Sequence, residues 1–167
     1  MKLEHIGIAT RSLDDALSFW RDALGLEVAQ NLITTQAYYW DLNDRTRAFN
    51  ARVRPKSPEL WPNMANAGIY AQTLHYLKAV ADLGSAQAKG DGAAVVARMK
   101  AMATDDDAFG PGRIRDDGRK LHPAYLMQVK TPAESRGRHD VLKLLATVPP
   151  EEAFRPLQEG GCPFVRT

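Results

Sequence analysis

The sequence contains one cysteine, Cys162, so no disulfide can form within the chain. It has no run near the ~20 apolar residues that a transmembrane helix needs, so no membrane insertion is expected. The first residues also differ from a secretory signal, because charged side chains such as Glu4 and Arg11 interrupt every apolar stretch. Taken as written, the sequence therefore predicts a cytoplasmic protein.

The charge of the chain is nearly balanced. The 22 Lys and Arg against 20 Asp and Glu give a net charge of +2, which argues against a phosphate-binding surface and against nucleic acid as a partner. Charged residues make up 25% and hydrophobic residues 44%, as in ordinary soluble domains. Two charged clusters, at residues 136–139 and 105–107, are therefore interpreted as a solvated loop and an exposed turn.

The start of the chain has the pattern of a strand, a helix and a second strand. Ile6 and Ile8 alternate with other residues in 3–10, and apolar residues recur at helical spacing over 13–24. Gly25 predicts the end of that helix. An extended segment then runs on to Trp40, so a strand-helix-strand unit is expected over residues 3–40.

The remainder of the chain mixes helices and strands, which predicts an α/β fold. Helices are expected over residues 44–52, 63–83 and 93–102, and capping of the first is assigned to Asp41 or Asn43. In 63–83, helical spacing makes one apolar stripe, formed by Ile69, Thr73, Tyr76, Leu77 and Val80. Strands are expected at 112–115, 121–130 and 141–147, followed by an extended tail from residue 151.

Four segments carry a resemblance to a known family: AYYWDLNDRTRAF, ANAGIYAQTLHYLKAV, GRIRDDGRKLHPAYLMQVKTPAES and LATVPPEEAFRPLQEGGCP. Residues 33–167 thereby resemble the C-terminal part of periplasmic solute-binding proteins of the branched-chain amino acid ABC transporter type. The resemblance implies part of a type I periplasmic-binding-protein lobe, with three layers and a mostly parallel sheet covered by helices. It also implies a periplasmic location and an ABC permease as partner.

The same resemblance suggests ligand-binding residues. Tyr38, Tyr39 and Trp40 match an aromatic run near the hinge of the family, and Ala65 with Asn66 lies where the long helix begins beside the ligand cleft. Because much of the polar recognition in the family comes from an N-terminal lobe that this chain lacks, weak or no binding is expected. Asp41 is a candidate for holding a ligand ammonium.

Residues 1–32 carry a different resemblance. The run HIGIATRSLDDALSFWRDALGLEV is similar to the first strand and helix of the glyoxalase, or vicinal oxygen chelate, superfamily, in the manner of methylmalonyl-CoA epimerase. The resemblance implies a divalent metal with His5 as one ligand. A catalytic metal needs about three protein ligands, and the other histidines, His75, His122 and His139, lack the paired spacing of a metal motif. No other cofactor is expected.

Three functions stay open on these grounds. The first is a truncated binding module for a small amino acid or related carboxylic acid, which is not an enzyme. The second is a metal-dependent isomerase or lyase of the glyoxalase type, and the third is an inactive fusion of two segments joined near residues 30–32. Unpaired sheet edges in a partial lobe would also permit a homo-oligomer.

Overall fold

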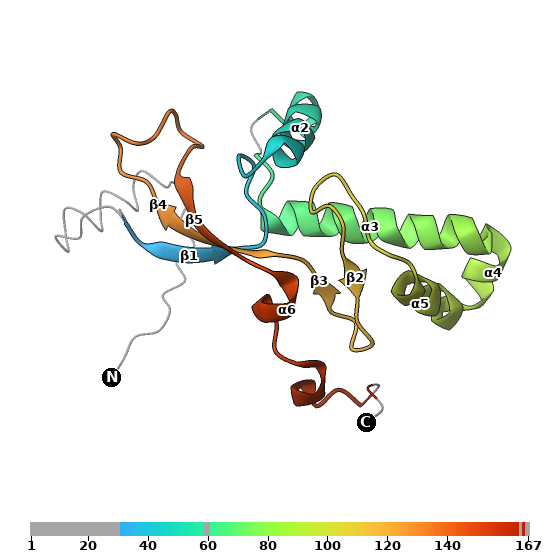
Figure 1. Ribbon diagram of the computed structural model, residues 1–167. Helices are drawn as coiled ribbons and strands as arrows, with labels where there is room; N and C mark the ends of the chain where they lie inside the picture. Colours follow the sequence, from blue (N-terminus) through green and yellow to red (C-terminus); the bar gives the residue numbers. More distant parts are fainter. Residues whose placement is uncertain (1–30, 59–60, 164, 166–167) are drawn as a thin grey trace, which may run out of the picture.

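The computed structural model describes residues 31–58, 61–163 and 165, which form a mixed α/β structure (Figure 1). The strand and helix expected within residues 3–24, and His5 with them, lie outside the described residues. None of the helices in the described part of the chain is long and apolar enough to cross a membrane. The α/β class expected from the sequence is confirmed.

A three-stranded sheet has the order β1-β4-β5, with β1 at Ile33–Gln36, β4 at Ala124–Val129 and β5 at Leu142–Val148. Both neighbouring pairs are antiparallel, and a bulge lies between Leu126 and Met127. The expectation of a mostly parallel sheet is wrong for these strands, because β4 and β5 are consecutive and are joined by a hairpin loop.

A second, two-stranded sheet pairs β2 at Arg113–Ile114 with β3 at Lys120–Leu121. The connecting turn contains Gly118 with φ 82°, a left-handed conformation that glycine adopts without steric cost. The sequence therefore places this turn correctly, and it merges β3 and β4 into one predicted strand that the structure divides in two.

Helix α2, Asp44–Val53, begins at a capping box in which Asn43 accepts from the Thr46 amide and Thr46 accepts from the Asn43 amide. Asn43, rather than Asp41, is thus the cap. A 3-10 turn, η2 at Arg54–Lys56, follows. The core lies between α2, the long helix and the loop before β2, where Tyr38, Phe49, Ala67 and Ala108 are buried together.

The long helix α3, Met64–Leu83, has the expected length and is followed by Gly84 with φ 83°. Its buried residues are Ala67, Ala71, His75 and Ala79. The apolar stripe predicted from the spacing faces the other way, with Ile69 60% and Leu77 54% exposed. The alanines decide the packing, because small side chains let a helix backbone approach its neighbours closely.

Two short helices return the chain toward the β2–β3 sheet, α4 at Ser85–Gly90 and α5 at Gly92–Ala101. Asp91 caps α5 by accepting from the Ala94 amide, and Val95 is its buried residue. The next segment contains residues 105–107, which were expected to form an exposed turn. This prediction is wrong for Asp106, because its carboxylate is 9% exposed and accepts hydrogen bonds from Lys120 and from two backbone amides.

The end of the chain is less extended than the sequence predicts. A short helix α6, Pro150–Ala153, and a 3-10 turn η3, Leu157–Gly160, interrupt it. Pro150 favours the first of these helices, because proline is well accommodated at a first helical position.

Candidate functional site

The three consecutive aromatic residues after β1 have three different surroundings. Tyr38 is 2% exposed and packs in the core against Phe49. Its burial raises the pKa of the Tyr38 hydroxyl well above the ordinary value, and this hydroxyl has no hydrogen-bond partner in the described part of the chain. Tyr38, predicted to bind ligand, therefore lies in the core.

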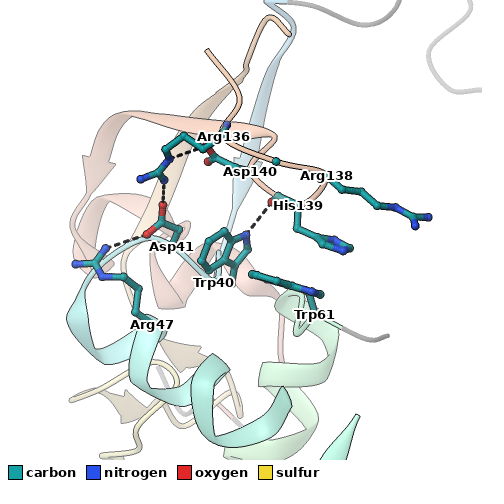
Figure 2. A pocket seen from close by; sticks show the side chains of 9 residues that line it. Trp40, Asp41, Arg47, Trp61, Arg136, Arg138, His139 and Asp140 are labelled. Carbon is teal, nitrogen blue, oxygen red and sulfur yellow. Dashed lines mark hydrogen bonds and ion pairs between the residues drawn. The ribbon is translucent and has the colours of Figure 1, made fainter. Parts of the chain in front are cut away.

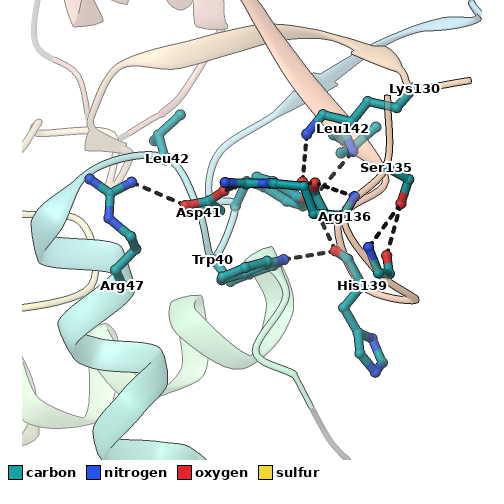
Figure 3. Close-up of polar contacts among 12 residues, drawn as sticks. Trp40, Asp41, Leu42, Arg47, Lys130, Ser135, Arg136, His139 and Leu142 are labelled. Atoms are coloured by element: carbon teal, nitrogen blue, oxygen red, sulfur yellow. Dashed lines mark hydrogen bonds and ion pairs between the residues drawn. The ribbon is translucent and has the colours of Figure 1, made fainter. Parts of the chain in front are cut away.

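Tyr39 and Trp40 hold the loop between β4 and β5. The Tyr39 hydroxyl donates to the His139 carbonyl at 3.0 Å and accepts from the amides of Val141 and Leu142 at 3.0 and 3.3 Å. The Trp40 indole nitrogen donates to the same His139 carbonyl at 2.8 Å (Figure 3). Segments about 100 residues apart in sequence are thereby fixed side by side.

A pocket of about 430 Å³ opens where these segments meet, lined by Trp40, Asp41, Arg47, Trp61 and residues 136–140 (Figure 2). Three rings form its aromatic wall: the centroids of Trp61 and His139 lie 4.6 Å apart with the rings stacked, and Trp40 meets Trp61 edge to face at 4.4 Å. The Arg54 guanidinium lies over the Trp61 ring at 4.4 Å, a cation–π contact that helps to fix this indole.

The charged side of the pocket is an ion-pair network around two carboxylates. Asp41 pairs with Arg47 at 3.1 Å and with Arg136. Asp140 accepts from Lys130 at 2.6 Å and from the Arg136 side chain and amide at 2.9 and 3.0 Å. Arg136 thus bridges both aspartates (Figure 2).

These contacts shift the titration of the network. The Arg136 guanidinium, and next to it Lys130, lowers the pKa of Asp140 well below the ordinary value, against the opposing effect of burial. The two aspartates in turn raise the pKa of Arg136. Nearby, Lys143 and Thr131 lower the pKa of Glu134 to about 2. Asp140 and Arg136 therefore both carry their charges at neutral pH.

The other predicted ligand residues lie elsewhere. Ala65 lines a second pocket of about 480 Å³, between the start of α3 and the turn that contains Gly118. Asn66 instead belongs to the capping box at the start of α3, since its side chain accepts a hydrogen bond from the Asn63 amide at 3.2 Å. Of the five predicted residues, only Trp40 lines the aromatic pocket.

Several residues of the aromatic pocket were not predicted, among them Arg47, Trp61, Arg136 and Asp140. The sequence favours a solvated loop for the cluster of 136–139, although the acidic Asp140, directly after this cluster, is also a signal for ion pairing with its two arginines. No three His, Cys, Asp or Glu side chains gather as metal ligands among the described residues. A metal bound through His5, which lies outside them, stays a prediction.

The chain is similar to a known protein family and to several solved structures. The family model described as periplasmic binding protein matches residues 9–137, a range that includes much of the segment likened to glyoxalase. A comparison with curated proteins gave no match. Among solved structures, a periplasmic binding protein from Burkholderia mallei is 37% identical with a TM-score of 0.72, and the alignment covers 87% of this chain.

Two further structures have the same fold. A branched-chain amino acid ABC transporter periplasmic ligand-binding protein from Burkholderia xenovorans LB400 is 35% identical with a TM-score of 0.71 over 86% of this chain. A solute binding protein of an ABC transporter from Rhodopseudomonas palustris BisB5, in complex with 3,4-dihydroxy benzoic acid, is 19% identical with a TM-score of 0.58, over 73% of this chain and 32% of its own. The chain spans 37% of the length of each Burkholderia protein. With the matched family model and these identities, the chain belongs to the periplasmic binding protein family.

Proposed function

We propose that the chain acts as a solute-binding module of the ABC transporter type, and that the pocket at Trp40, Trp61 and His139 binds a small amino acid or related carboxylic acid. The pocket itself supports this most directly. Small-molecule sites combine apolar, often aromatic, walls with a few oriented polar groups, and here three rings face a cluster of arginines and aspartates.

The transporter role extends to this chain from its relatives. The Burkholderia xenovorans protein is described as a ligand-binding protein of a branched-chain amino acid ABC transporter. In this proposal the chain delivers its ligand to an ABC permease in the periplasm.

Thermal unfolding of the full chain with and without candidate ligands tests the proposal. At a concentration ten times Kd, a bound ligand stabilises the folded state by roughly 1.4 kcal/mol, which is a shift of roughly 3–6 °C for a chain of this size. Leucine, valine and aromatic carboxylates form the panel. A flat response across the panel at high millimolar concentrations would reject the binding function.

A matched pair of variants locates the site. Trp61→Ala removes one wall of the pocket and should abolish the ligand-induced shift. Tyr76→Ala removes an aromatic side chain that is 46% exposed on α3, away from the pocket, and should leave the shift intact. An unchanged shift in Trp61→Ala would indicate that the ligand binds outside the aromatic pocket.

A further inference from the structure

Both carboxylates in the aromatic pocket are already neutralised. Asp41 has two guanidinium partners, on Arg47 and Arg136, and Asp140 has the Lys130 ammonium and Arg136. Both aspartates are also poorly accessible, with side chains 15% and 5% exposed. A ligand ammonium would have to displace one of these cations to reach a carboxylate. The two aspartates of the pocket are therefore poor binding groups for an ammonium.

The accessible charge of the pocket is positive. The Arg136 side chain is 70% exposed despite its ion pairs. Arg138 is exposed as well, and none of the ion pairs around the two aspartates uses it. Figure 2 shows its guanidinium extending past the His139 ring, away from Asp41. A guanidinium can bind a carboxylate through two parallel hydrogen bonds.

The remaining lining of the pocket is aromatic. The Trp61 and His139 rings are stacked on each other within 15° of parallel, Trp40 meets Trp61 edge to face, and all three line the pocket. Aromatic lining favours aromatic ligands, because a ligand ring gains contact area together with an offset-stacked or edge-to-face arrangement. A branched aliphatic side chain gains only the contact area.

We infer that the pocket selects planar aromatic carboxylates that carry no ammonium group, over α-amino acids. The inference rests on the proposed function and narrows its ligand class. Arg138 binds the carboxylate at the rim, and the ring of the ligand lies against the aromatic wall. A zwitterionic amino acid meets the same arginines with a positive group that finds no free carboxylate, and like charges brought together oppose binding.

Calorimetric titration of the full chain with benzoate, phenylalanine, leucine and benzamide tests the inference. Benzoate should bind at least tenfold more tightly than either amino acid, and more tightly than benzamide, which has the same shape without the charge. Leucine or phenylalanine binding as tightly as benzoate would overturn the inference and leave the binding function standing. Absence of binding by all four compounds would overturn both.

Two charge variants separate a specific contact from general attraction. Arg138→Gln should weaken benzoate binding about tenfold and leave benzamide binding unchanged. Arg113→Gln makes the same charge change at an exposed residue of β2, outside the pocket, and should have no effect on either compound. An equal effect of both substitutions on benzoate would show that Arg138 makes no specific contact and would refute its assigned role.

Discussion

Replacing Asp140 with asparagine should destabilise the fold, because this carboxylate holds the loop between β4 and β5 together. Asp140 is 4% exposed and accepts three hydrogen bonds, from Lys130 and from the side chain and amide of Arg136. An asparagine keeps one oxygen and presents an NH2 group to the remaining donors. Lys130, whose side chain is 13% exposed, then loses its counter-charge.

The size of the effect follows from the Lys130 contact. Hydrogen bonds to charged groups contribute about 1.5–3 kcal/mol each, whereas ion pairs of exposed side chains contribute little. Since the Arg136 side chain is largely exposed, the Lys130 pair dominates, and a total loss of about 2 kcal/mol is expected. For a chain of this length that loss lowers Tm by roughly 4–8 °C.

The effect should depend on pH with a definite sign. The pKa of Asp140 is lowered in the folded protein, so its stabilising contribution is complete above the unfolded-state value near 3.9 and is lost as pH falls through the lower folded value. The difference in stability between the wild type and Asp140→Asn should therefore be constant from about pH 8 to 5 and shrink below about pH 4.

Urea unfolding followed by tryptophan fluorescence at several pH values measures this difference. Asp116→Asn is the control, because Asp116 is exposed and its carboxylate contributes no contact to the loop. It should change the free energy of unfolding by less than about 0.5 kcal/mol. An Asp140→Asn protein as stable as the wild type at pH 7, or a difference that persists unchanged at pH 2, would refute the reasoning.

Three other predictions concern the fold. Gly110→Ala and Gly118→Ala should each cost roughly 1–2 kcal/mol, because both residues have φ near +80°. A methyl group at 110 would lie 1.2 Å from a guanidinium nitrogen of Arg45, but this nitrogen is the end of a flexible, exposed side chain that can move aside; a much larger loss for Gly110→Ala in urea unfolding would contradict this. Tyr39→Phe deletes a hydroxyl with three hydrogen bonds and should cost about 1–3 kcal/mol with faster amide exchange at residues 141 and 142; unchanged exchange would count against it. Met127→Ala should cost about 2–5 kcal/mol in urea unfolding, since Met127 is 1% exposed, and a loss below about 1 kcal/mol would mean that the side chain is loosely packed.

Much of the secondary structure could be predicted from local signals. Gly84 and Asn63 delimit α3 to within one residue of the predicted range, because a capping side chain and a left-handed glycine act on the backbone next to them. The side of α3 that packs could not be predicted. Periodicity favours the large residues at 69, 76 and 77, whereas the helix buries its alanines, and only the shape of the neighbouring elements decides between two apolar faces.

The candidate site was predicted only in part for a similar reason. The family resemblance points to Trp40, but Trp61 and His139, which contact it in the structure, lie 21 and 99 residues further along the chain. No local pattern connects such positions. The arginines near Asp140 have the sequence pattern of a solvated loop. Their ion pairs form because the hairpin loop contacts the segment after β1.

The hydrogen bonds from Tyr39 and Trp40 to the His139 carbonyl span 100 and 99 residues, which has a consequence for folding kinetics. Contacts between such distant positions carry a loop-closure cost, which slows the folding of chains that depend on them. A ligand that needs both segments stabilises only the states in which these segments have met. The division of its effect between the refolding and unfolding rates therefore reports whether they meet before or after the transition state.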